Sequence, residues 1–199
     1  MTAGVAVALA GAVVGGGASR PAQAADATFG ALPVVPFFSE VRSVAATDGA
    51  VWINDSLALR EFTTSGDPRQ VAAVTVGADD NFSGLAFDAA GRIWTADQSQ
   101  HTVIAFPASS SGSLTAASAT GRISGFVDPV AVASDEAGDL WVADEGAGMD
   151  AVFEFPAAKV AGGILSLADA SMRIAFGTEL PTALAVGGDG TLWVAAGSG

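Results

Sequence analysis

The sequence predicts an all-β protein, a β-propeller of four-stranded antiparallel blades, and two observations carry that prediction. The first is a repeated phrase, PVAVASDEAGDLWVAD at residues 129–144, with copies at residues 83–97 and 182–196 and a degraded copy at residues 43–55. The second is the spacing of the four tryptophans, which lie 42, 47 and 52 residues apart, one in each copy. Strand-rich units that repeat every forty to fifty residues or so are typical of propellers.

Each copy of the phrase predicts a β-hairpin. An apolar run leads into a turn that contains glycine, and a second apolar run follows with the tryptophan near its start. Glycine supplies the positive φ that such turns need. The segments TVIAFP (102–107) and AVFEFP (151–156) predict a third strand, and the segments that begin at Val71, Thr120 and Ser171 predict a fourth. Each complete unit therefore has four strands.

The hairpin strands are apolar on both faces. In runs such as LWVA and GLAF, apolar residues follow one another instead of alternating with polar ones. This pattern indicates strands that are covered on both sides. Stacked blades provide such cover, so we expect four equivalent tryptophans to pack between adjacent blades: Trp52, Trp94, Trp141 and Trp193.

The chain divides into three parts. Residues 1–25 have the pattern of a signal peptide, because a run of small and apolar residues ends in a small-x-small cleavage pattern at residues 22–24. Residues 26–40 contain two prolines and predict an extended lead-in. The repeats follow as blades at residues 41–78, 79–126 and 127–178 and a truncated blade at residues 179–199.

About three and a half blades make an incomplete ring, because sheets that lack their outer strands leave edges exposed. We therefore expect a fragment of a longer protein. The other interpretation is that residues 28–38 fold back and supply an outer strand.

Composition and charge exclude several kinds of partner. The formal net charge is −13, with a single histidine. Such a chain does not displace counterions from nucleic-acid phosphates, nor does it dock on an anionic membrane. Without cysteine there are no disulfides and no thiolate sites. The leader predicts export, so we expect the mature chain to be secreted or held in the cell envelope, with no membrane span.

A family resemblance agrees with this architecture. The unit P-x-x-[LV]-A-[FV]-x-x-x-G-x-[IL]-W-[TV]-A-D, read over residues 40–199, resembles the NHL repeat and its relatives among six-bladed propellers. It also resembles the senescence-marker-protein/gluconolactonase propellers and, more loosely, the streptogramin lyases. The resemblance implies the fold and leaves the chemistry open, since this fold hosts binding scaffolds, lactone hydrolases and lyases alike.

Acidic and amide side chains gather in the loops that would open on one face of the ring, around its central channel. Oxygen ligands of this kind suit Ca²⁺ or another hard divalent cation, which makes such an ion the candidate cofactor. A solvated acidic rim is the plainer interpretation. The candidate ligand or metal residues are Glu40, Asp79, Asp80, Asn81, Asp128 and Glu179. The regularly repeated Asp55, Asp97 and Asp144 are instead expected to accept backbone N–H groups within their turns.

The motifs of the enzymes are not matched. The lactonase resemblance implies a metal-ligating Asn or Asp eleven residues before the aromatic residue of the second strand, where this chain has Ser83, Val130 and Thr182. The one histidine, His101, falls in a short turn with no partner base in sight. We therefore assign no catalytic residue.

The sequence favours an exported binding or scaffold module over an enzyme. Its channel mouth would take a neutral or cationic small molecule, an envelope polymer or a protein. The alternative is a divalent-metal-dependent lactone hydrolase or lyase.

Overall fold

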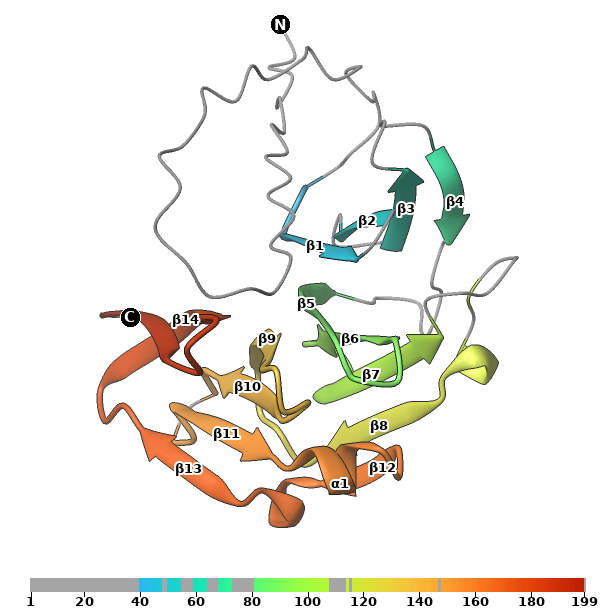
Figure 1. Ribbon diagram of the computed structural model, residues 1–199. Helices are drawn as coiled ribbons and strands as arrows, with labels where there is room; N and C mark the ends of the chain where they lie inside the picture. Colours follow the sequence, from blue (N-terminus) through green and yellow to red (C-terminus); the bar gives the residue numbers. More distant parts are fainter. Residues whose placement is uncertain are drawn as a thin grey trace, which may run out of the picture. The chain divides into compact units, whose positions relative to one another are not determined.

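The computed structural model describes residues 40–47, 50–54, 59–63, 68–72, 81–107, 114, 116–146 and 148–198, all within the unit Ser39–Gly199. These residues are almost entirely β-structure, with fifteen strands and one four-residue helix, α1 (Ala157–Val160) (Figure 1). No helix among them is long and apolar enough to cross a membrane. The leader and residues 26–39 of the lead-in lie outside the described residues.

Three antiparallel sheets follow the order of the chain. The first comprises β1 (Ser43–Thr47), β2 (Ala50–Asn54), β3 (Leu59–Thr63) and β4 (Pro68–Ala72). The second comprises β5 (Phe82–Phe87), β6 (Arg92–Asp97), β7 (Thr102–Pro107) and β8 (Gly121–Ser124). The third comprises β9 (Pro129–Ser134), β10 (Leu140–Asp144), β11 (Ala151–Phe155) and β13 (Met172–Ala175). A hairpin of β14 (Glu179–Val186) and β15 (Leu192–Ser198) comes last.

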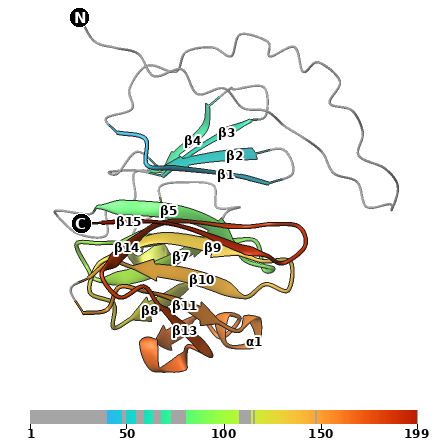
Figure 2. The same cartoon turned by 90° about the vertical axis from the view of Figure 1, so that its left-hand side faces the viewer.

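This architecture confirms the predicted fold class: repeated four-stranded units followed by half a unit. The first strands of successive sheets lie side by side, β1 beside β5, β5 beside β9 and β9 beside β14 (Figure 2). The hairpin turns also form as expected, because Gly91, Gly138 and Gly190 all have φ between 74° and 85°. An L-residue with a side chain rarely adopts that conformation.

One strand was not anticipated from the sequence. β12 (Ile164–Ser166) lies in the connection between β11 and β13, yet it pairs in parallel with β8 of the second sheet. The second sheet therefore has five strands, the outermost contributed by the third repeat. Two short 3₁₀ turns, η1 (Ala116–Ser118) and η2 (Leu167–Asp169), flank these outer strands in the chain.

Three tryptophans contact the sheet that follows their own. Trp52 is 1 % exposed in a cluster with Phe82 and Phe106 of the second sheet, and Trp94 is fully buried against the third. Trp141 is half-buried and packs towards β14 and β15. These contacts place the core between the sheets.

Trp193 differs from the expectation that all four tryptophans pack between blades, because its side chain is 67 % exposed. Its strand, β15, pairs with β14 alone among the described strands, and no further described sheet covers that face. Trp193 thus occupies the position in its hairpin that the other tryptophans occupy in theirs, but no following sheet among the described residues packs against it.

Candidate functional site

Polar side chains converge at one end of the sheets. In each sheet this is the end at which the first strand begins and at which the second strand turns into the third. Two adjoining depressions of about 440 and 390 Å³ lie there, and both are lined by Gln98 and Glu145. Gln98 comes from the turn between β6 and β7, and Glu145 directly follows β10. We call these two depressions together the mouth. Both depressions are largely open to solvent.

The first depression lies between the second and third sheets. Its wall carries a mixture of amide, hydroxyl, imidazole and carboxylate groups, from Asn81, Gln98, Ser99, His101, Val127, Asp128, Glu145 and Gly146. Two of the six candidate ligand residues, Asn81 and Asp128, are therefore brought into one wall.

Gln98 holds three strand ends together through its side-chain amide. Its Oε1 accepts hydrogen bonds from Asn81 Nδ2 at 2.9 Å and from Arg42 Nη1 at 3.3 Å. Its Nε2 donates to Asp128 Oδ1 at 2.9 Å. Arg42 also pairs with Glu40, Nη2 to Oε2, at 3.1 Å. Side chains from three successive sheets are thus fixed in one hydrogen-bonded chain, which limits the reorganisation that ligand binding requires.

The folded structure disfavours the charged form of the Glu145 carboxylate. Its partial burial raises the pKa, and the nearby charges of Asp128, Asp150 and Asp144 raise it further. Its backbone N–H donates to the Asp128 carbonyl at 3.0 Å, which fixes the residue in the wall. A positive group in the mouth would relieve the repulsion that these neighbouring carboxylates exert on the ionised form of Glu145.

His101 serves the backbone in this structure. The residue has a positive φ of 55°, and its Nδ1 contacts the carbonyl oxygen of Val127 across the gap between the second and third sheets. No carboxylate among the described residues is hydrogen-bonded to its ring. The arrangement suits a structural link better than a general base.

The second depression tests the lactonase interpretation. Its lining includes Val41, Ser83, Val130 and Thr182, one from each repeat, and each stands eleven residues before a tryptophan. These are the positions at which the lactonase resemblance implies metal ligands. An aliphatic side chain at two of the four and a hydroxyl at the other two are a poor donor set for a divalent cation.

The described residues contain no group of three acidic or histidine side chains placed to hold a metal ion. Glu40 lines the second depression in its ion pair with Arg42, and Glu179 is exposed at the start of β14, lining neither depression. Asp79 and Asp80 lie outside the described residues. Among the residues described, the fit to calcium is poor.

The repeated turn aspartates accept backbone N–H groups. Asp144 is fully buried, and its carboxylate accepts from the N–H groups of Val127 at 2.9 Å, Asp128 at 2.6 Å and Gly146 at 3.3 Å. Asp97, also fully buried, accepts from Gln100 N at 3.1 Å. Asp55 lies outside the described residues. Asp144 therefore fixes the loop that carries the wall of the mouth.

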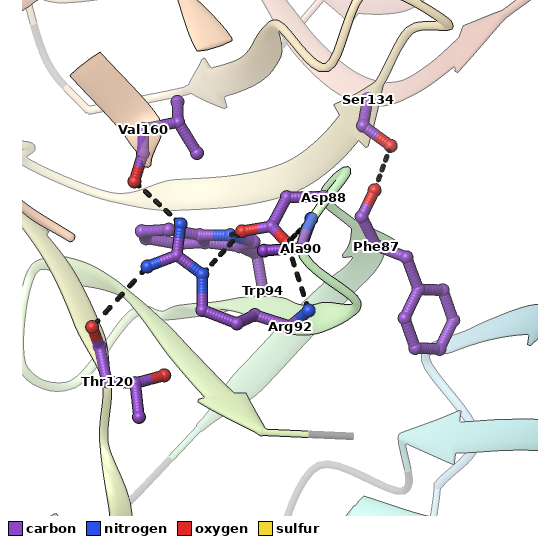
Figure 3. A network of polar contacts seen from close by, with 8 residues as sticks. All are labelled: Phe87, Asp88, Ala90, Arg92, Trp94, Thr120, Ser134 and Val160. Atoms are coloured by element: carbon purple, nitrogen blue, oxygen red, sulfur yellow. Dashed lines mark hydrogen bonds and ion pairs between the residues drawn. The ribbon is translucent and has the colours of Figure 1, made fainter. Parts of the chain in front are cut away.

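A further aspartate, overlooked in the sequence, organises the hairpin of the second sheet. Asp88 Oδ2 accepts from Trp94 Nε1 at 2.8 Å and from Arg92 Nε at 2.6 Å, while Oδ1 accepts from the backbone N–H groups of Ala90 and Arg92 (Figure 3). Burial alone would raise the pKa of this carboxyl. The hydrogen bonds from Trp94 and Arg92 outweigh that effect and hold the pKa below its ordinary value. The signal was available, as D-x-x-G-x-x-W occurs at Asp88 and again at Asp135.

Comparison with known proteins shows the architecture. The chain aligns with virginiamycin B lyase from Staphylococcus aureus, solved with quinupristin, at 11 % identity and a TM-score of 0.57, over 81 % of this chain and 50 % of that one. It aligns with a putative gluconolactonase at 14 % identity and a TM-score of 0.59, over 78 % of this chain and 55 % of that one. The fold is that of a β-propeller.

A third similar propeller comes from a nidogen/laminin complex, at 16 % identity and a TM-score of 0.54, over 72 % of this chain and 50 % of that one. The chain spans about half the length of these solved structures. No family model and no curated protein matches it. At these identities the likeness establishes the propeller fold, and the similar structures include both enzymes and a protein in a binding complex.

Proposed function

We propose that the chain is an exported binding module that takes a polar ligand, neutral or cationic, at the mouth of its propeller. The observation that carries the proposal is the hydrogen-bonded chain from Arg42 through Gln98 to Asp128, which joins three successive blades in the walls of two adjoining depressions. Prearranged donors and acceptors in a concave wall favour binding.

The negative charge of the mouth favours ligands that carry a positive group. Asp128 and Glu145 stand in the same wall, and the pKa of Glu145 is raised by burial and by neighbouring carboxylates. The one cation in the lining of either depression, Arg42, is already paired with Glu40. A ligand with an amino or guanidinium group would neutralise this wall, so the balance favours a cationic ligand over a neutral one.

The lining favours binding over hydrolysis. The positions Val41, Ser83, Val130 and Thr182 carry no carboxylate or imidazole, and His101 contacts a backbone carbonyl. A lactone hydrolase needs a general base or a metal-bound water next to its substrate. The two carboxylates in the lining of the second depression, Glu40 and Glu145, stand outside these positions, and Glu40 is paired with Arg42.

The proposal is tested by titrating the full chain with two probes, spermidine as a cation and chitotriose as a neutral polar oligomer, followed by calorimetry. We expect saturable binding of spermidine that weakens in Glu145→Gln and in Gln98→Ala. The matched control is Glu136→Gln, which removes one negative charge from an exposed turn at the other end of the third blade. Equal weakening in the control would mean that the binding reflects net charge and not the mouth.

A hydrolysis assay separates the two function classes. We expect no turnover of δ-gluconolactone with added calcium, zinc or manganese. Metal-dependent turnover that disappears in Glu40→Ala or Asp80→Ala would replace the binding module with a lactonase.

A further inference from the structure

Arg42 and Asp128 bind opposite ends of one side-chain amide in the mouth. The amide oxygen of Gln98 accepts a hydrogen bond from Arg42 Nη1 at 3.3 Å, and its Nε2 donates to Asp128 Oδ1 at 2.9 Å. Asn81 Nδ2 also donates to that oxygen, at 2.9 Å, and two donors on one side fix the orientation of the amide. A positive and a negative group therefore stand on either side of Gln98, in the walls of the two adjoining depressions.

The distance between these two charges is limited by the amide that connects them. Because the oxygen and nitrogen of an amide lie about 2.3 Å apart, Arg42 Nη1 and Asp128 Oδ1 are at most about 8.5 Å apart. The ammonium and carboxylate groups of an α-amino acid are about 3 Å apart, and a charge-assisted hydrogen bond adds about 2.8 Å at each end. Such a head group can therefore reach both side chains at once.

Arg42 can exchange its present carboxylate partner for one that belongs to a ligand. In its ion pair with Glu40, Nη2 to Oε2 at 3.1 Å, the side chain of Glu40 is 64 % exposed and that of Arg42 is 31 % exposed. An ion pair as exposed as this one contributes little to stability. A ligand carboxylate can accept two parallel N–H groups from a guanidinium, which is the stronger arrangement. The exchange therefore costs little.

The other side of Gln98 suits an ammonium group. Asp128 and Glu145 line the same depression, and the backbone N–H of Glu145 donates to the Asp128 carbonyl, so two carboxylates come from neighbouring positions in one wall. Among the described residues that line this depression there is no lysine or arginine. An ammonium group has three donors and can bond to more than one carboxylate.

We infer that the mouth binds the zwitterionic head group of an α-amino acid. The ammonium group bonds to Asp128 and Glu145, and the carboxylate takes the place of Glu40 on Arg42. The inference rests on the proposed function and narrows its ligand class, from a cation to a cation with a carboxylate beside it. Gln98 lies between the two contacts and holds both side chains in place.

Calorimetric titration of the full chain at pH 7 with two matched probes tests the inference. Cadaverine is L-lysine without its carboxylate, so the ratio of the two dissociation constants measures what that group contributes. We expect L-lysine to bind about tenfold more tightly than cadaverine. Arg42→Gln should abolish this preference without weakening cadaverine binding. The control is Arg122→Gln, which removes a positive charge from an exposed position of β8 and should leave the ratio unchanged.

Glu40→Gln should change the ratio in the opposite direction. It removes the carboxylate that competes for Arg42, so the preference for L-lysine over cadaverine should increase. Equal affinities for the two probes would overturn the inference, and so would a preference that Arg42→Gln leaves unchanged. In either case, cadaverine binding that weakens in Glu145→Gln would still support the proposed function. If neither probe bound, both the inference and the proposed function would be wrong.

Discussion

Trp94 donates a hydrogen bond from its indole Nε1 to Oδ2 of Asp88, six residues earlier, at 2.8 Å. The third blade repeats the contact between Trp141 and Asp135 at 3.3 Å. In the second blade, Arg92 adds an ion pair to Asp88 and lies over the Trp94 ring, 5.2 Å from its centre. The tryptophan that marks the repeat is therefore both a packing residue and a polar anchor for its own turn.

Asp88→Asn should destabilise the protein by about 2–3 kcal/mol at pH 7, because it replaces a buried acceptor of four hydrogen bonds with a group that carries two donors. Urea unfolding measures the loss. Asp189→Asn is the control, since that carboxylate is exposed and bonds only to its own turn. A similar loss in the control would mean that the indole contact contributes little.

The same variant predicts a pH dependence. The pKa of Asp88 is lower in the folded than in the unfolded chain, so its stabilisation is fully present above the ordinary pKa of an aspartate, about 4. It disappears as the pH falls through the lower, folded value. The difference in unfolding free energy between the original chain and Asp88→Asn should shrink below about pH 4. A difference that stays constant down to pH 2 would contradict this.

Truncation of two equivalent tryptophans should have unequal effects. Trp94→Ala removes a fully buried side chain and should cost about 3–5 kcal/mol. Trp193→Ala removes a side chain that is 67 % exposed and should cost less than about 1 kcal/mol when measured on the monomer. Chemical denaturation at low protein concentration compares the two. Equal costs would show that Trp193 is buried within the single chain.

Asp144→Ala should destabilise the protein by about 2–3 kcal/mol, because three backbone N–H groups lose their acceptor. The loss should be the same with and without millimolar calcium. A metal role for this aspartate predicts instead that calcium raises the melting temperature of the original chain and not that of the variant.

Glu145→Gln should stabilise the protein at pH 7, by a few tenths to about 1 kcal/mol, because it removes a charge held near three other carboxylates. The pKa of Glu145 is raised in the folded chain, so the cost of its charge is present above that raised value. It is absent below the ordinary glutamate pKa, about 4.3. The gain should therefore vanish in acid, while Glu136→Gln, in an exposed turn, shows little change at either pH. If Glu145→Gln were less stable than the original chain, the claim that the Glu145 charge destabilises the folded protein would be wrong.

The sequence predicted the sheets because each physical signal recurred. Glycine at a fixed place in the hairpin turn, apolar runs on both sides of it and a tryptophan at one position are local patterns, and three such turns have the expected φ at Gly91, Gly138 and Gly190. β12 escaped prediction because its partner, β8, lies about forty residues earlier in the chain and in another repeat. No local pattern encodes such a pairing.

The mouth was only partly predictable. Asn81 and Asp128 were singled out as acidic or amide residues in connecting loops, and the structure places both in one wall. Gln98 was missed, although it connects them, because a glutamine in a turn has no distinctive pattern. The exposure of Trp193 was missed because equivalence in sequence says nothing about whether a neighbouring sheet is present.

The parallel strand β12 connects the second and third blades through backbone hydrogen bonds. It pairs with β8, Arg122 N donates to the Gly163 carbonyl just before it, and Arg92 Nη2 reaches the Val160 carbonyl at 2.7 Å in the same connection. The third blade thus supplies the outermost strand of the second sheet, and hydrogen bonds join the two blades along it. We therefore expect the second and third blades to unfold together in one cooperative step under force or in denaturant. The β14–β15 hairpin shares no strand with another described sheet, so we expect it to unfold first.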